Sequence, residues 1–307
     1  QDKCFDHYIT GNGVDVPNNF DKQYNPDSAN LKAGVAYKNV YASEFGTSGS
    51  SSFESMSATL SERHWGLHGG MKANNCTDSD TKCQGKHICY GTNPMSERNY
   101  ACDAQIRLYF GTGIDLTATG KVAFQGQLYL CQLAQAFVLK QVYEKRRSQN
   151  QLGHLVWMLN EIWPTVGWGS LEYGPSAPGQ VQGGRWKPLH YFYKQSLMTD
   201  VMATCGVRGG GLICYVSNHR PNLPFHGTVT LTAYEHFRSH KTTEEIVFRR
   251  RMELPRGPGA IRWFYFPPTK RGWNDRTLIS TVHHEDNRNI LSEHMVQLVK
   301  PMDILTP

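Results

Sequence analysis

The sequence contains no apolar run near the roughly 20 residues that a membrane span requires, so no transmembrane helix is predicted in its 307 residues. Its eight cysteines include no C-x-x-C pair, which weakens the case for a zinc module. We find no internal repeat. What is present is a chain with 39% hydrophobic residues, enough to build the core of one large or two ordinary domains.

Neither sign of charge is in large excess, because the net charge is only +6. The basic run Arg249-Arg250-Arg251 is flanked by Val247, Phe248 and Met252, a pattern typical of a strand with one solvated face. No interleaved aromatic and basic residues surround the run, so we reject a nucleic-acid-binding module. Thirteen histidines add positive charge below about pH 6.5, and the chain becomes more cationic in an acidic compartment.

Half of the cysteines crowd one short, polar, turn-rich stretch: Cys76, Cys83, Cys89 and Cys102. With His87 nearby, a structural zinc site is a rival interpretation. The same stretch carries the glycosylation sequon Asn75-Cys76-Thr77, which favours disulfides in a protein of the secretory route. The pairing cannot be deduced from the sequence, although Cys205 with Cys214 would close a plausible hairpin.

The chain opens at Gln1 with neither Met nor a signal peptide, and we therefore expect a mature or processed product. Together with the expected disulfides, this indicates a lysosomal or secreted protein without a membrane span.

A strand–helix–strand order is predicted in the first half of the chain. Residues 39–45 suit a buried strand that ends at Gly46, and a short helix capped by one of the serines follows within residues 50–56. Residues 126–148 repeat apolar side chains at helical spacing and end in a basic turn. Residues 155–159 are almost continuously apolar, as in a strand covered on both sides. This order predicts a βαβ unit that places Glu44 and Trp157 at the same end.

From about residue 201 the pattern changes to short β runs separated by turn signals, as in an antiparallel sandwich of Ig-like size. We expect runs at 212–216, 228–234, 245–249, 261–266, 277–282 and 295–299.

Three motifs in this order resemble a known family. They are Ser43-Glu44-Phe45-Gly46, then Trp157 to Pro164 in the pattern W-x-L-N-[DE]-x-W-P, then Gly184 to Tyr191 in the pattern G-[RK]-W-K-x-L-H-Y. A shorter match, Asn289 to Glu293, resembles a hairpin of the family's sandwich domain. The chain thus resembles β-mannosidases of glycoside hydrolase family 2, over most of residues 39 to 300.

The resemblance implies an α/β plus β fold, made of the C-terminal portion of a (β/α)8 TIM barrel and an antiparallel Ig-like β-sandwich. We expect the barrel part in residues 1–200, with a cysteine-rich insertion at 69–104 that is interpreted as a disulfide-stapled surface loop in preference to a substrate lid. The sandwich is expected in residues 201–307. A short final helix around residues 189–197 leads out of the barrel.

The resemblance also implies site residues for a retaining glycosidase that needs no metal or organic cofactor. Glu44 takes the role of nucleophile, and Trp157 that of a platform beneath the sugar. Asn160 and, as the weaker candidate, Glu161 are expected to hydrogen-bond sugar hydroxyls. His7 and Tyr8 resemble, more loosely, a His/Tyr pair on the family's sixth barrel strand. Arg185 and Lys187 are interpreted as structural residues that pair with acids, and Trp163, Trp168 and Trp186 as packing residues.

The acid/base carboxylate is expected on the fourth barrel strand, upstream of everything in this chain, because an eight-stranded barrel takes about 250 residues. We therefore expect a C-terminal proteolytic chain that is held to an N-terminal chain of the same precursor and acts on β-mannoside oligosaccharides. Two alternatives remain open. One is a family-2 exo-glycosidase of other specificity, such as a β-glucosaminidase or β-glucuronidase, and the other is a non-catalytic sugar-binding or scaffold protein.

Overall fold

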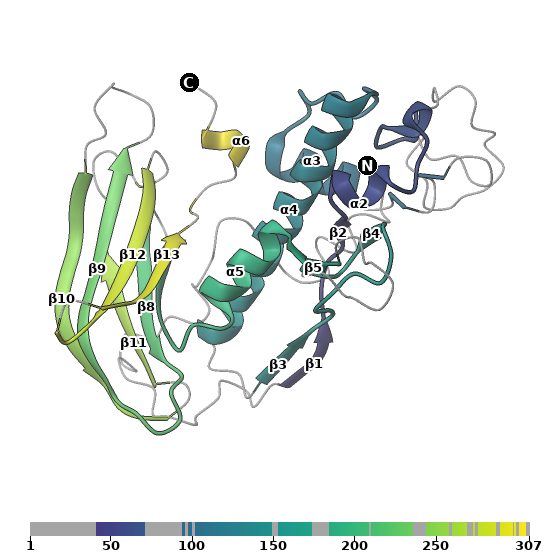
Figure 1. Cartoon of the computed structure of the whole chain (residues 1–307). Coiled ribbons are helices and arrows are strands. Elements are labelled where there is room, and N and C mark those ends of the chain that lie inside the picture. The colour runs from purple at the N-terminus through teal and green to yellow at the C-terminus, as the bar shows by residue number, and fades with distance from the viewer. Residues whose placement is uncertain are drawn as a thin grey trace. The chain divides into compact units, whose positions relative to one another are not determined.

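The chain forms two compact units in a computed structural model (Figure 1). The structure describes residues 41–70, 94–95, 98–99, 102–148, 153–173, 184–208, 210–235, 244–257, 260–268, 273, 276–286, 289–296, 298 and 301–304. Among these, the first unit holds residues 44–140 and 155–192, and the second holds 41–43, 141–154 and 193 onward.

Helices α3 (Cys102–Phe110) and α4 (Lys121–Ser148) dominate the first unit. The long predicted helix exists and begins five residues earlier than its apolar pattern indicated. Its predicted core positions Phe137 and Val138 are buried. The main core of the unit joins α3 and α4 to the loops around them through buried side chains: Met56, Leu67, Met95, Cys102, Ile106, Leu116, Phe124, Leu128, Cys131 and Val166.

The strands of the first unit are short and pair in twos. Strand β1 (Tyr41–Phe45) pairs with β3 (Gly153–Val156), and the two lie side by side in Figure 1. The other pairs are β2 (Gly49–Ser50) with β4 (Val166–Gly167), and β5 (Leu171–Glu172) with β6 (Arg185–Trp186).

Two predicted helices flank these strands. Helix α2 (Phe53–Ser57) begins after Ser52, whose hydroxyl accepts a hydrogen bond from the Ser55 N–H, as the predicted cap requires. The short helix η3 (Glu62–His64) follows it, and α5 (Pro188–Ser196) is the expected final helix.

The prediction of a strand covered on both sides at residues 155–159 is wrong for the described structure. Strand β3 ends at Val156, and Leu155 and Leu159 are 54% and 56% exposed. A continuous apolar run predicts that both faces of a strand are buried, but it does not identify the segment that buries them. In the described part of the chain, nothing packs over these two side chains closely enough to bury them.

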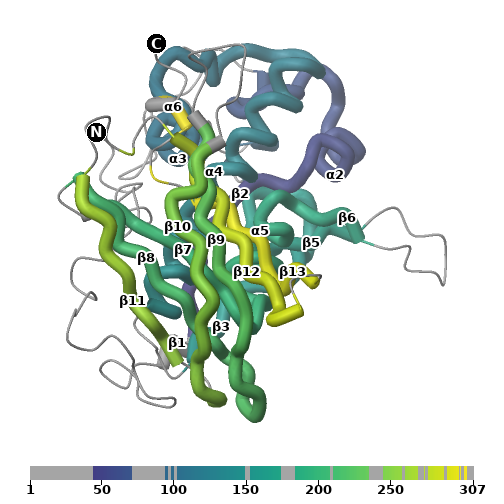
Figure 2. The backbone as a smooth tube through the Cα atoms, turned by 90° about the vertical axis from the view of Figure 1, so that its left-hand side faces the viewer, coloured from purple at the N-terminus to yellow at the C-terminus, as the bar shows by residue number. Residues whose placement is uncertain are grey.

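The second unit contains a sandwich of two antiparallel sheets. One sheet has the strand order β10-β9-β12-β13, which Figure 2 shows side by side, and the other has the order β11-β8-β7. All six predicted β runs fall within or overlap these strands, and β7 begins at the predicted change of pattern. The strands are β7 (Val201–Arg208), β8 (Gly211–Asn218), β9 (Phe225–Glu235), β10 (Glu244–Leu254), β11 (Ala260–Phe266), β12 (Arg276–His284) and β13 (Ile290–Val296), and the short helix α6 (Pro301–Ile304) follows them.

Apolar side chains from both sheets form the core of the sandwich. Alternation is visible on β12, where Leu278, Ser280 and Val282 point inward while the residues between them are half-buried. Ser280 donates its hydroxyl proton to the Ala203 carbonyl, and Ser292 does the same to the Val201 carbonyl at 2.7 Å. These bonds connect β12 and β13 of one sheet to β7 of the other.

The end of α4 also belongs to this unit and buries an acidic side chain. Glu144 is fully buried, and its carboxylate lies 2.7 Å from the His294 ring and accepts a hydrogen bond from Thr204 at 3.2 Å. The Tyr215 hydroxyl donates to the Glu144 carbonyl at 2.7 Å. Buried ionisable groups persist when they are paired and hydrogen-bonded in this way.

Two disulfides lie among the described residues. Cys205 and Cys214 face each other on β7 and β8, so the predicted hairpin bridge is confirmed. Cys102, however, pairs with Cys131 of α4 and not with a cysteine of its own stretch. With Met95 and Asn99 also buried, the end of the predicted insertion belongs to the core of the first unit. Cys76, Cys83 and Cys89 lie outside the described residues.

None of the helices in the described ranges combines the length and the apolar character that crossing a bilayer demands.

Candidate active site

Glu44 occupies the penultimate position of β1, with an exposed side chain. The next side chain, Phe45, is buried, as alternation along a strand requires. From there the chain enters a buried loop, because Thr47, Ser48 and Ser50 are almost inaccessible. The carboxylate is therefore presented to solvent from a backbone that is held firmly on its C-terminal side.

Trp157 lies beside this strand end, immediately after β3. Its backbone N–H donates to the Phe45 carbonyl at 2.8 Å, and its side chain is 49% exposed. The peptide bond from Trp157 to Met158 is cis. Gly46 makes the close approach possible, since a Cβ there would collide with the Trp157 carbonyl oxygen. The structure thus brings together the backbone that carries Glu44 and the backbone that carries Trp157.

Buried glutamines hold the loop that follows Glu44. Gln105 of α3 donates to the Thr47 hydroxyl at 3.0 Å and to the Ser48 carbonyl at 2.9 Å. Gln135 of α4 donates to the Thr47 carbonyl at 3.0 Å. Neither glutamine is predicted from the sequence as part of the site, because an amide at a helical position gives no local signal of a loop that lies more than 50 residues away.

A buried ion pair joins the loops behind the two site residues. The Lys187 ammonium lies 2.7 Å from the Glu161 carboxylate and donates to the Gly49 carbonyl at 3.2 Å. Burial raises the pKa of Glu161, while the charge and hydrogen bond of Lys187 act against that rise. The interpretation of Lys187 as a structural residue paired with an acid is confirmed. The weaker suggestion that Glu161 bonds sugar hydroxyls is wrong, since its carboxylate is buried against Lys187.

Glu172 forms a second buried acidic centre. Its carboxylate accepts hydrogen bonds from the Ser52 N–H at 2.8 Å and from the Ser52 and Ser55 hydroxyls, each at 2.6 Å. Gln132 of α4 donates to it at 3.4 Å, and the Arg185 guanidinium lies 3.9 Å away. Arg185 is therefore also paired with an acid, as predicted. This centre fixes the start of α2 and hence the far end of the loop that begins at Gly46.

The other residues of the two tryptophan-containing motifs lie in the same region. Asn160 donates to the Glu161 carbonyl at 3.1 Å and forms an isolated β-bridge with Leu171. Trp163 is half-exposed beneath the Arg98 guanidinium, and Trp186 stacks against His190 of α5. His7, Tyr8 and the sequon residue Asn75 lie outside the described residues.

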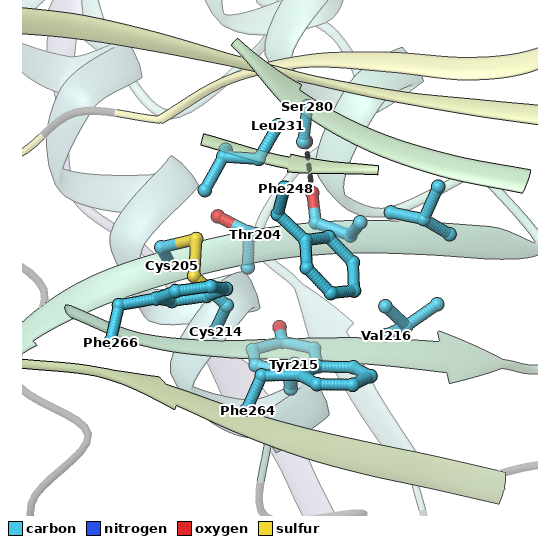
Figure 3. Close-up of a pocket in the computed structure, with 12 residues that line it drawn as sticks. Thr204, Cys205, Cys214, Tyr215, Val216, Leu231, Phe248, Phe264, Phe266 and Ser280 are labelled. Atoms are coloured by element: carbon cyan, nitrogen blue, oxygen red, sulfur yellow. Dashed lines mark hydrogen bonds between the residues drawn. A yellow bond between two sulfur atoms is a disulfide. The ribbon is translucent and has the colours of Figure 1, made fainter. Parts of the chain in front are cut away.

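The sandwich contains a small cavity that is distinct in character from this site (Figure 3). Its volume is about 20 Å³, which holds at most a single water molecule. Most of the side chains that line it, including Phe248, Phe264 and Phe266, are apolar, and the Cys205–Cys214 disulfide forms part of its wall. A sugar does not fit there, and we regard the cavity as a packing void. Within the described ranges, no cluster of three or more potential metal ligands occurs.

No protein-family model matches the sequence. The curated β-mannosidase of goat (Capra hircus) is 30% identical over 164 residues, which are 50% of this chain and 16% of the goat protein. The rat β-mannosidase (Rattus norvegicus) is 39% identical over 79 residues, or 23% of this chain and 8% of the rat protein. The chain therefore matches only a small part of the length of these relatives.

Solved structures share the fold. The crystal structure of the β-D-mannosidase from Dictyoglomus thermophilum gives a TM-score of 0.56 at 17% identity, covering 87% of this chain and 28% of that one. An exo-chitosanase from Amycolatopsis orientalis gives 0.52 at 12% identity, with the same coverage. Motifs, curated relatives and fold agree, and they support a region similar to the C-terminal part of β-mannosidases of glycoside hydrolase family 2.

Proposed function

We propose that this chain supplies the nucleophile of a retaining exo-glycosidase that removes terminal β-D-mannose from oligosaccharides. One observation carries the proposal. Glu44 is an exposed carboxylate at a strand end, and its strand is hydrogen-bonded to the segment that presents the half-exposed Trp157. A carboxylate and an aromatic face on adjacent segments suit the attack on a sugar whose C–H face rests on an aromatic ring.

In the proposed reaction, a Glu44 oxygen attacks the anomeric carbon as the glycosidic C–O bond breaks. The leaving oxygen takes a proton from a second carboxyl group, which in retaining enzymes lies about 5–5.5 Å from the nucleophile. Water then gives a proton back to that second carboxylate and attacks the glycosyl ester. Hydrolysis of the ester releases mannose and restores the Glu44 carboxylate.

We propose that the second carboxylate belongs to another chain, derived from the N-terminal part of the same precursor. The support is the exposed apolar surface around β3, where Leu155, Leu159 and Ile162 are each more than half exposed. Strand pairs with uncovered edges and faces need a partner. Further strands of a barrel would cover this surface, and they would bring the acid/base group with them.

Asn160, and also His7 and Tyr8, are proposed to contact the sugar. Asn160 is half-buried and follows the exposed Trp157 by three residues. The two disulfides support a lysosomal or secreted location, since such bonds persist in oxidising compartments. The fold is shared by an exo-chitosanase, so sugar specificity is the point that most needs a direct test.

The test uses Glu44→Gln in the assembled enzyme, meaning this chain with the polypeptide that completes the barrel. Turnover of an aryl β-mannoside should fall at least about 10³-fold, because the nucleophile is lost, while folding and chain association stay intact. Glu54→Gln, which changes an exposed glutamate of α2, is the matched control and should keep full activity. The 307-residue chain alone should be inactive.

A fluorinated mannosyl trap provides the second measurement. It should label the peptide that contains Glu44. Labelling of another peptide would show that the nucleophile is a different residue. Aryl β-glucosaminide and β-glucuronide substrates should react more slowly than the β-mannoside. Near-normal turnover by Glu44→Gln would refute the proposed function.

A further inference from the structure

The Lys187–Glu161 ion pair lies between the two loops that extend from the proposed catalytic groups. The Lys187 side chain is 1% exposed and that of Glu161 is 5% exposed. Lys187 donates to the carbonyl of Gly49, in the loop behind Glu44, and to the carboxylate of Glu161, in the loop behind Trp157. One ammonium group therefore bridges the loops through two hydrogen bonds.

The surroundings give this pair little freedom. Gly49 pairs with Gly167, and the Ser51 N–H donates to the Thr165 carbonyl at 2.8 Å, so both loops run together past the ion pair. A Cβ at Gly167 would collide with the Glu161 carboxylate. The buried carboxylate thus packs directly against the backbone of Gly167.

Stability alone is a poor explanation for such a pair. Removing two charges from water costs free energy that their attraction often fails to recover, and apolar residues of the same size frequently stabilise a protein as well or better. The hydrogen bonds of an ion pair are directional, because an ammonium group must point its protons at defined acceptors. Here the acceptors are one atom from each loop.

We propose that Lys187 and Glu161 are positioning residues, which fix the loop behind Glu44 relative to the loop behind Trp157. This inference rests on the proposed function of Glu44. A shift of about 1 Å in a reacting group costs on the order of 10²-fold in rate. Loss of the bridge should therefore lower kcat by about 10- to 100-fold, and labelling by the fluorinated trap should slow by a similar factor. KM should change little, since the sugar still rests on Trp157.

The experiment compares Lys187→Met with the double variant Glu161→Gln/Lys187→Met in the assembled enzyme. The single variant leaves a buried carboxylate unpaired and should be less stable than the wild type. The double variant removes both charges and should recover most of that stability, but its kcat should stay low because Gly49 has lost its donor. Recovery of kcat together with stability would show that the pair serves packing alone, and would overturn the inference.

Arg276→Met is the matched control, because it removes a buried cation that is paired with Glu245 in the sandwich. It should lower stability without changing kcat or the rate of trapping. The proposal would also be contradicted if Lys187→Met had the kcat of the wild type at a temperature where the variant is folded.

Hydrogen exchange provides a readout that does not depend on activity. The amides of residues 46–52 should exchange faster in both Lys187 variants than in the wild type or in Arg276→Met. Unchanged exchange would refute a positioning role. A wild-type enzyme that cleaves no aryl glycoside would instead refute the proposed function, while exchange would still report whether Lys187 fixes the loop.

Discussion

His219 should make the sandwich unit sensitive to acid. It follows β8, and its backbone N–H donates to the Asp200 carbonyl at 2.8 Å. Burial, reinforced by repulsion from the positive charges of Arg147 and of a protonated His154, lowers the pKa of His219 to about 2. Burial, reinforced by Arg146 and Arg147, lowers the pKa of His154 to about 4. Both rings are therefore neutral in the folded protein at neutral pH.

The sign of the effect follows from proton binding. In the unfolded chain each histidine binds a proton near pH 6.5, whereas in the folded chain it does so only at much lower pH. Stability is complete above about pH 6.5 and is lost progressively as the pH falls through the folded pKa. Between pH 7.5 and pH 5, each ring should reduce the free energy of unfolding by about 2 kcal/mol. The two together should remove about 4 kcal/mol, a large share of a typical 5–15 kcal/mol.

The perturbation is His219→Gln, which keeps a polar side chain and removes the titration. Urea unfolding of the assembled enzyme at pH 7.5 and pH 5, followed by fluorescence of the buried Trp263 and Trp273, should show a loss of stability about 2 kcal/mol smaller than in the wild type. His226→Gln, at a ring that is 43% exposed, is the control and should leave the pH dependence unchanged. If His219→Gln loses as much stability as the wild type, the reasoning from burial is wrong.

The remaining predictions concern the two disulfides and two of the glycines. Removing Cys102–Cys131, which spans 29 residues, should cost about 3.6 kcal/mol by loop-closure entropy. Removing Cys205–Cys214, which spans 9 residues, should cost about 2.6 kcal/mol. Denaturant titration of double alanine variants measures both, and the reverse order would contradict the entropic account. Gly46→Ala should cost about 1–3 kcal/mol and lower kcat, because its Cβ meets the Trp157 carbonyl oxygen. Gly126→Ala, with open space in helix α4, should instead stabilise by about 1 kcal/mol in the same titration.

Local pattern in the sequence was enough for much of the secondary structure. The long helix, the cap at Ser52, the β runs after residue 201 and the Cys205–Cys214 hairpin all depend on residues close together in the chain. Hydrophobic period, capping chemistry and hairpin geometry act over such short distances. The motifs likewise predicted the similarity to β-mannosidases, which the curated relatives support.

The arrangement around Glu44 was decided only by tertiary structure. No short-range rule pairs Cys102 with Cys131, places Gln105 and Gln135 on the loop behind Glu44, or aims Lys187 at Gly49, 138 residues away. Gln105 and Gln135 reach the loop because helices α3 and α4 pack against it. Local sequence pattern by itself determined the long helix and the strands of the sandwich. Packing determined which polar side chains meet, since a buried donor or acceptor must find its partner wherever the fold places one.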